Sequence, residues 1–181
     1  MVSRLVHQKG IDLTLAIADE MVAAGGRLVS IGCGEPELEQ AMRELAERYP
    51  GRVGVHIGFD ETTARRIYAG SDFLLMPSRY EPCGLSQMYA QRFGSLPIAR
   101  HTGGLADTII DGVTGLLFRD ETPASYFDAV RRALNIYRYP ELLNAMRCKA
   151  MESPLPWEDA VRPYTALYQR LLQRVPAQAV R

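Results

Sequence analysis

The chain has 181 residues, which is enough for one domain with a sizeable hydrophobic core. Its 21 lysines and arginines balance 21 aspartates and glutamates. This balance provides no basic stripe for a nucleic acid or an anionic membrane surface, so we expect neither as a partner. No apolar run approaches the ~20 residues of a membrane helix. Any binding of an anion must therefore come from a local arrangement of residues.

The cysteine content favours a reducing compartment. The three cysteines have no CxxC spacing and are Cys33, Cys83 and Cys148. They indicate neither a disulfide framework nor a zinc site, and the three histidines lack metal-ligand spacing. We expect a cytoplasmic protein without a bound metal. Cys83 is expected to be a packed thiol or a passive pocket wall, because no histidine lies nearby in the sequence.

Short apolar runs alternate with helix-compatible segments up to residue 121. The expected strands are, in chain order, 1–5, 27–31, 52–57, 73–76, 96–99 and 116–118. The expected helices between them are 12–24, 37–49, 61–68, 85–93 and 105–110, of which the third can be capped by Asp60. The remaining pattern is helical, over 123–138, 140–151 and 157–174. This alternation predicts an α/β fold, with a parallel sheet, flanking helices and a helical C-terminal segment.

Residues 78–89 follow a buried strand and lead into the helix expected at 85–93. They place Glu81, a proline and Gly84 at the carboxyl end of the strand, where open α/β sheets bind ligands. The N–H groups of Gly84, Leu85 and Ser86 would face a phosphate at the start of the helix. Alternatively, Glu81 is a simple turn residue or an N-cap.

Two cations lie near the first expected strand, Arg4 at its end and Lys9 in the loop that follows it. Such cations can hold a diphosphate and stabilise the charge that grows on it as it departs. Their spacing alone favours a different interpretation, in which both are solvated surface side chains.

Three further segments are candidates for a ligand site. Phe59 ends the third strand and is either a base-stacking aromatic or a core residue. Thr102 and Gly103 belong to a glycine loop before a short helix, which allows close backbone approach to a ligand or forms only a turn. Residues 32–34 lack the GxGxxG spacing of a dinucleotide fingerprint, so we expect only a tight turn there.

Residues 78–89, together with Thr102-Gly103-Gly104-Leu105, resemble the bacterial glycogen synthase and plant starch synthase family of retaining glycosyltransferases. The resemblance extends from Val2 to about Leu172. It implies that residues 1–181 form one Rossmann-like domain, the C-terminal nucleotide-sugar-binding domain of a two-domain GT-B architecture. The N-terminal domain, which carries the acceptor groove, is then expected to be absent from this chain.

The resemblance also implies roles for individual residues. Arg4 and Lys9 match cations that bind the diphosphate of the donor. Glu81 matches the first of two glutamates and would lie near the sugar. Phe59 takes the place of an aromatic residue, often tyrosine, that stacks on adenine. Tyr89 departs from the motif, because it replaces the second glutamate, and this departure resembles the bacterial glycogen synthase branch.

The family reaction transfers glucose from ADP-glucose to the 4-OH at the end of an α-1,4-glucan, with retention at the anomeric carbon. The resemblance implies a nucleotide-sugar donor and a glucan acceptor, with no metal or other cofactor. It leaves the choice between ADP-glucose and UDP-glucose open. The alternatives are a non-catalytic ADP- or ADP-glucose-binding module and a nucleotide-sugar epimerase-like domain.

The resemblance also carries expectations for the chain on its own. Without an N-terminal half, the isolated chain is expected to be inactive. The last helix has a strongly apolar face, which is then expected to be exposed or to pair with another copy of the chain.

Overall fold

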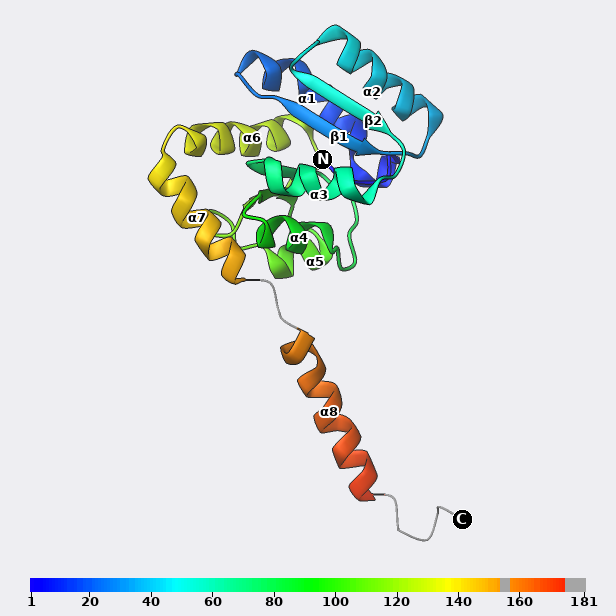
Figure 1. The fold of residues 1–181 in the computed structure, drawn as a ribbon, viewed down its shortest axis with the longest axis vertical. Helices are drawn as coiled ribbons and strands as arrows, with labels where there is room; N and C mark the ends of the chain where they lie inside the picture. Colours follow the sequence, from blue (N-terminus) through cyan, green and yellow to red (C-terminus); the bar gives the residue numbers. More distant parts are fainter. Residues whose placement is uncertain (154–156, 175–181) are drawn as a thin grey trace.

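Parallel strands alternate with helices along the chain (Figure 1). This computed structural model describes residues 1–153 and 157–174. The strands are β1 (Leu28–Gly32), β2 (Val53–Ile57), β3 (Phe73–Met76), β4 (Leu96–Arg100) and β5 (Leu116–Phe118). The helices are η1 (His7–Lys9, a 3-10 turn), α1 (Ile11–Ala23), α2 (Pro36–Arg48), α3 (Glu61–Gly70), α4 (Ser86–Arg92), α5 (Gly103–Thr108), α6 (Pro123–Tyr137), α7 (Pro140–Glu152) and α8 (Trp157–Arg174).

Local sequence signals account for the ends of several helices. Asp60 caps α3, because its carboxylate accepts a hydrogen bond from the Thr63 N–H at 2.7 Å. Thr122 caps α6 in the same way through the Ser125 N–H, and Pro123 supplies the fixed φ of the first helical turn. The expected helices are all present, with ends displaced by at most two residues.

The sheet is parallel and consists of two hydrogen-bonded parts. β1 pairs with β2, and β4 lies between β3 and β5. Residues 1–5, expected as a regular strand, form only isolated parallel bridges beside β1, at Val2 and Leu5, and the structure corrects that expectation. Gly32 and Gly34 permit the close approach, because a Cβ at either position would overlap a carbonyl oxygen of residues 1–5.

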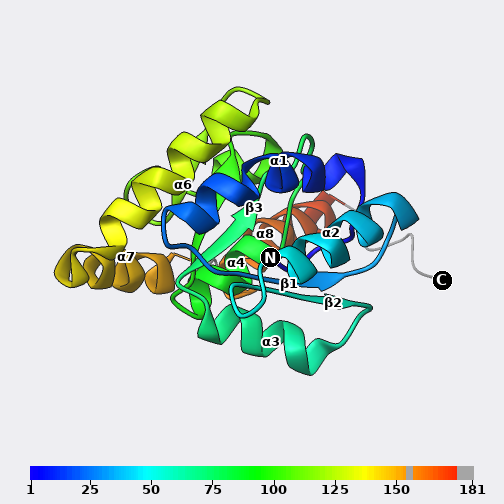
Figure 2. The same ribbon diagram turned by 90° about the horizontal axis from the view of Figure 1, so that it is seen from above.

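Helices cover both faces of this sheet. α1, α2 and α6 pack on one face, and α3, α4 and α5 pack on the other. Figure 2 shows α1 and α2 on the opposite side of β1 and β2 from α3. The arrangement confirms the expected α/β class, with a Rossmann-like parallel sheet and flanking helices.

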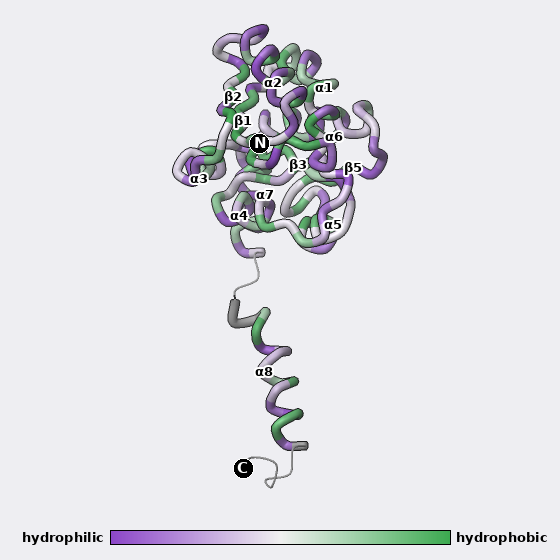
Figure 3. Tube along the Cα trace, turned by 90° about the vertical axis from the view of Figure 1, so that its right-hand side faces the viewer, coloured by the Kyte–Doolittle hydropathy of each residue, from purple (hydrophilic) through white to green (hydrophobic). Residues whose placement is uncertain are grey.

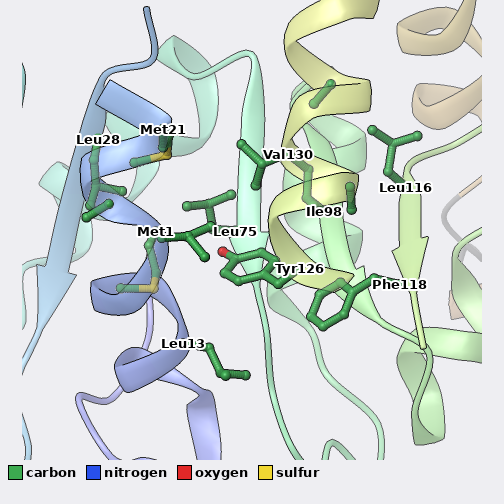
Figure 4. Close-up of a cluster of buried hydrophobic side chains, with 14 of the residues drawn as sticks. Met1, Leu13, Met21, Leu28, Leu75, Ile98, Leu116, Phe118, Tyr126 and Val130 are labelled. Atoms are coloured by element: carbon green, nitrogen blue, oxygen red, sulfur yellow. The ribbon is translucent and has the colours of Figure 1, made fainter. Parts of the chain in front are cut away.

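Each face has its own hydrophobic cluster. The larger cluster joins α1 and α6 and includes Tyr126, whose ring stacks on Phe118 at a centroid distance of 4.9 Å (Figure 4). Burial raises the pKa of the Tyr126 hydroxyl, which lies 3.5 Å from Thr14 Oγ1. The smaller cluster lies beneath α3, α4 and α5. Together they hold the carboxyl ends of the strands in fixed relative positions.

The helix that follows residues 1–5 and the helix that follows β3 pack on opposite faces of the sheet. The chain passes from residues 1–5 into α1 on one face, and from β3 into α4 on the other face. Ligands of open α/β sheets bind in the crevice at such a switch point, because the two loops diverge there. The first loop carries Lys9 and the second carries Glu81. The topology therefore brings the two main candidate loops to one edge of the sheet.

The last helix, α8, extends away from the rest of the molecule (Figures 1 and 3). Hydrophobic and hydrophilic residues alternate along it in Figure 3, and its side chains from residue 160 to residue 173 are all exposed. Among residues 1–153 and 157–174, no helix combines the length and the apolar character needed to cross a bilayer. The apolar face of α8 is thus open to solvent in this chain.

Candidate active site

Two adjoining pockets lie at the switch point of the sheet. The smaller, of about 200 Å³, is lined by Val2, Ser3, Arg4, Lys9, Leu75, Met76, Ser78 and Ser86. The larger, of about 660 Å³, shares Val2, Ser3, Arg4 and Ser86 with the smaller and adds residues from β1, α3, α4 and the loop after β2. The shared residues make the two pockets parts of one continuous site.

Lys9 and Glu81 meet beside the smaller pocket. Lys9 Nζ donates a hydrogen bond to Glu81 Oε2 in an ion pair, and Ser78 Oγ donates to the same oxygen at 3.2 Å. The Lys9 and Glu81 side chains are only 19% and 10% exposed. Lys9 and Ser78 line the pocket, whereas Glu81 is not among its lining residues and reaches it through its contacts with these two side chains. Two residues that lie 72 positions apart in the sequence are therefore held in direct contact at the edge of a cavity.

Glycines allow the loops around this ion pair to pack backbone against backbone. A Cβ at Gly10, which has a φ of 69°, would overlap the Pro77 carbonyl oxygen. A Cβ at Gly103, which has a φ of 43°, would overlap the carbonyl oxygen of Glu81. Gly104 N–H donates to that same oxygen at 3.0 Å. The glycines after Thr102 form the first turn of α5, where we expected a preceding loop, and their close approach is to the chain itself.

Arg4 is the second cation of the smaller pocket, and it also lines the larger one. Its side chain is exposed, and its Nη2 donates to Gln8 Oε1 at 3.3 Å. Gln8 Nε2 in turn donates to the Tyr80 carbonyl at 2.9 Å. The guanidinium therefore stays available to a ligand, while Gln8 links its segment to the loop after β3.

Aromatic side chains line the larger pocket. Phe59 stands 85% exposed at its rim and so is not a core residue. The ring of Tyr68 lies edge-on to Tyr89 at 6.2 Å and stacks on Phe93 at 6.5 Å. Burial raises the pKa of the Tyr68 hydroxyl. An exposed aromatic beside an apolar groove is suited to stacking on a flat heterocycle such as a base.

Several residues that line the larger pocket were not predicted from the sequence to bind a ligand. Among them are Gly32, Cys33, Tyr68 and Phe93. Gly32 and Cys33 belong to the segment that we interpreted only as a tight turn. The one available signal was that Tyr89 and Phe93 are four residues apart on a helix and so share a face. Tyr68 comes from α3, and no pattern within α3 indicates that it meets α4.

The loop before α4 is hydrogen-bonded to the buried side-chain amide of Gln87. Gln87 Nε2 donates to the carbonyl oxygens of Cys83 and Gly84 at 3.1 and 2.9 Å. Leu85 stands at the N-cap position of α4, no side chain caps that end, and Ser86 lines both pockets. The thiol of Cys83 is free and exposed, which corrects the expectation of a packed residue. Thr102 precedes α5 without a side-chain capping bond.

Metal ligands do not gather at this site. In the described part of the chain, no group of three or more histidine, cysteine, aspartate or glutamate side chains is arranged to hold a metal ion. The positive charges at the smaller pocket come from Arg4 and Lys9 instead.

Comparison with known proteins matches the chain to one family. The family described as "Glycosyl transferases group 1" matches residues 1–152. A curated relative named glycogen synthase, from Pseudomonas aeruginosa, is 76% identical over 173 residues, which cover 96% of this chain and 34% of the relative. Another glycogen synthase, from Pseudomonas fluorescens, is 65% identical over 181 residues, which cover 100% of this chain and 35% of the relative. The chain thus spans about a third of the length of these relatives.

Solved structures agree with this match. The catalytic domain of Starch Synthase IV from Arabidopsis thaliana, bound to ADP and acarbose, superposes with a TM-score of 0.87 at 31% identity. That match covers 96% of this chain and 38% of the plant chain. Sucrose-phosphate synthase from Thermosynechococcus elongatus superposes with a TM-score of 0.75 at 25% identity, over 96% of this chain and 46% of that one.

Proposed function

Since this chain belongs to the family of group 1 glycosyl transferases, we propose that it is the C-terminal, donor-binding domain of a glycogen synthase. The complete enzyme would transfer glucose from ADP-glucose to the non-reducing end of an α-1,4-glucan with retention. The identity of 65–76% to glycogen synthases supports this proposal. The starch synthase neighbour, which was solved with ADP and acarbose, supports an adenine nucleotide as the donor's carrier.

The observation that carries the proposal is the contact between Lys9 and Glu81 beside the smaller pocket, which Arg4 also lines. Lys9 and Arg4 present several N–H donors to one small cavity. A diphosphate leaving group gains negative charge as its bond to the sugar breaks, and fixed cations stabilise that charge in the transition state. Charge-assisted hydrogen bonds of this kind are also the stronger ones.

The nucleoside would occupy the larger pocket, next to the diphosphate. Phe59 is our candidate for stacking on the base, and Gly32 and Cys33 line the same cavity without large side chains. The shared lining residues Arg4 and Ser86 would then face the diphosphate that joins the two parts of the donor. The N–H groups of Gly84, Leu85 and Ser86 would add donors to the same phosphates, while Cys83, Thr102 and Gly103 would shape the loop walls.

Glu81 would lie on the sugar side of the smaller pocket. Transfer with retention passes through an oxocarbenium-like transition state, which a nearby carboxylate stabilises. The Lys9 and Ser78 contacts would hold that carboxylate in one orientation. No divalent metal is required in this scheme, because side-chain cations neutralise the leaving group.

Three further expectations complete the proposal. The acceptor groove and the facing wall of the cleft would belong to an N-terminal domain outside these 181 residues. The exposed apolar face of α8 would bind that domain or, without it, a second copy of this chain. A reducing cytoplasm fits the three exposed cysteines, which are all free.

The test is calorimetric titration of the chain with ADP, ADP-glucose, UDP and UDP-glucose. We expect ADP to bind, and Lys9→Met to weaken its binding about tenfold or more, the value of one charge-assisted hydrogen bond. Lys149→Met is the matched control, because Lys149 forms an exposed pair with Glu152 on α7, away from both pockets. Arg4→Met should weaken binding in the same way.

Two results would contradict the proposal. Unchanged ADP affinity in both Lys9→Met and Arg4→Met would remove the diphosphate from this pocket. A large loss of ADP affinity on addition of a chelator would show that a metal ion does the work assigned to the two cations. Tighter binding of UDP than of ADP would keep the site but change the donor.

A further inference from the structure

We propose that Arg79 is a positioning residue, which holds the loop of Lys9 against the loop of Glu81 while a donor is bound. The inference rests on the proposed function, because it assumes that Lys9 contacts the donor's diphosphate. Neither Arg79 nor the groups that its side chain contacts line either pocket. Arg79 would therefore act through Lys9 and Glu81.

The side chain of Arg79 forms hydrogen bonds on both sides of Lys9, with residues that precede and follow it in the sequence. Its Nη1 and Nη2 donate to the two carboxylate oxygens of Asp12, each at 2.7 Å. Nη1 also donates to the His7 carbonyl at 2.6 Å, so the guanidinium bonds before and after Lys9 in the sequence. The hydrogen bond from Arg79 lowers the pKa of the Asp12 carboxyl, which keeps that partner charged.

The backbone of Arg79 belongs to the loop that carries Glu81, which follows two residues later. The Arg79 backbone N–H adds a further contact between the two loops, because it donates to the Gln8 carbonyl at 2.8 Å. Arg100 donates to the carbonyls of Ser78 and Arg79. Arg79 Nε meanwhile donates to Glu121 at 2.6 Å, and the Arg79 side chain is only 18% exposed. The guanidinium is thus fixed by partners from three separate segments.

The contacts of Arg79 between the two loops matter most when Lys9 binds a phosphate instead of Glu81. In the chain as described, the Lys9–Glu81 ion pair itself bridges the two loops. A diphosphate would compete with Glu81 for the ammonium group, so this bridge weakens at the moment when its geometry is needed. The contacts of Arg79 do not involve Lys9 Nζ or the pocket and would persist. Preorganisation of this kind reduces the ordering that binding must supply.

The experiment exploits a property of the sequence, because the chain contains only two lysines, Lys9 and Lys149. Protein labelled with isotope-enriched lysine therefore gives one NMR signal set for the site and one internal reference. A restrained lysine shows two distinct ε-proton signals, and a freely rotating one shows a single averaged signal. We expect distinct ε-proton signals for Lys9 in the ADP complex of the parent chain, and averaged ones in the ADP complex of Arg79→Gln.

Affinity gives the second measurement. We expect Arg79→Gln to weaken ADP binding roughly fivefold in the parent chain, within the range of coupling between residues of one network. In the Lys9→Met background, Arg79→Gln should alter ADP affinity less than about twofold, because the ammonium group that Arg79 positions is absent there. Arg132→Gln is the control, since Arg132 Nη2 donates to both carboxylate oxygens of Asp111, in a more exposed ion pair that lines neither pocket. Asp12→Asn provides a second route to the same prediction if Arg79→Gln folds poorly.

The outcomes separate the two claims. Equal losses from Arg79→Gln in both backgrounds, or distinct Lys9 ε-proton signals in its ADP complex, would overturn the positioning role and leave the proposed function intact. Unchanged ADP affinity in Lys9→Met alone would overturn the proposed role of Lys9 and this inference with it. Three results together would establish the positioning role of Arg79. The losses of ADP affinity from Arg79→Gln and Lys9→Met would be non-additive, Lys9 would show an averaged ε-proton signal in the ADP complex of Arg79→Gln, and Arg132→Gln would leave ADP affinity unchanged.

Discussion

Glu81 Oε2 accepts hydrogen bonds from both the Lys9 ammonium group and the Ser78 hydroxyl. Both charged side chains are largely shielded from water, so breaking the pair would leave a poorly solvated charge and cost more than breaking a surface pair. A ligand that displaces Glu81 from Lys9 must therefore offer the ammonium group a comparable partner. A phosphate oxygen does so, whereas a neutral ligand does not.

Gly103 offers a sharp test at the scale of one residue. We expect Gly103→Ala to lower both the free energy of unfolding and the ADP affinity, because the new methyl group would overlap the Glu81 carbonyl oxygen and displace its loop. Thermal unfolding and ADP titration measure the two effects. The positive φ alone contributes roughly 1 kcal/mol to the loss of stability.

Gly112→Ala is the control for that backbone term. Gly112 also has a positive φ, of 74°, but a Cβ there would meet nothing within 4 Å. It should lose stability through strain alone and keep its ADP affinity. If Gly103→Ala and Gly112→Ala behaved alike in both measurements, the close approach of α5 to the Glu81 loop would have no functional consequence.

At the scale of whole elements, α8 differs from the other helices. The apolar side chains of its exposed face are Val161, Tyr164, Leu167, Tyr168, Leu171 and Leu172. An apolar face of this size on a helix outside the core commonly marks a surface of association. The helices α1 to α7, by contrast, each bury part of their surface against the sheet or against one another.

We predict that this face drives self-association of the isolated chain. The double change Leu167→Glu with Leu171→Glu should reduce the sedimentation coefficient measured at high concentration to that of a monomer, because it places two charges on the apolar face. Gln169→Glu with Gln173→Glu adds the same charge to other positions of α8 and should leave association unchanged. A parent chain that sediments as a monomer at all concentrations would refute the prediction.

At the scale of the whole molecule, the chain spans about a third of the length of its relatives, and the proposed donor site lies within that third. Transfer requires the donor and the acceptor to be held in line, which is worth ~7–11 kcal/mol of the barrier. The exposed rim residues Arg4 and Phe59 indicate that the site is open to water in this chain. Solvent weakens the electrostatic stabilisation that the cations provide.

We therefore predict that the 181 residues bind ADP with a dissociation constant in the micromolar to millimolar range, roughly −8 to −4 kcal/mol, and transfer no glucose. The measurement is overnight incorporation of radiolabelled glucose from ADP-glucose into glycogen. Glu81→Ala serves as the background, and a complete glycogen synthase serves as the positive control. Incorporation by the parent chain above that background would mean that these residues suffice for catalysis.

The sequence by itself determined the elements and their order. Apolar periodicity is a local property, so the helices could be placed to within two residues, and the alternation of strands and helices predicted the parallel sheet. The run around Glu81, with its proline and glycine, located one loop of the site. Residues 1–5 were the exception, because their pairing depends on glycines at positions 32 and 34 and not on their own pattern.

Only the tertiary structure decided which loops meet. Lys9 and Glu81 lie 72 positions apart, and nothing in either segment encodes their hydrogen bond. Their contact follows from the strand order, which places two diverging loops at one switch point. The tertiary structure also decided the hydrogen bond between Arg79 and Asp12, and it brought Tyr68 from α3 to the larger pocket. Periodicity is set by neighbours along the chain, whereas a binding site is set by neighbours in space.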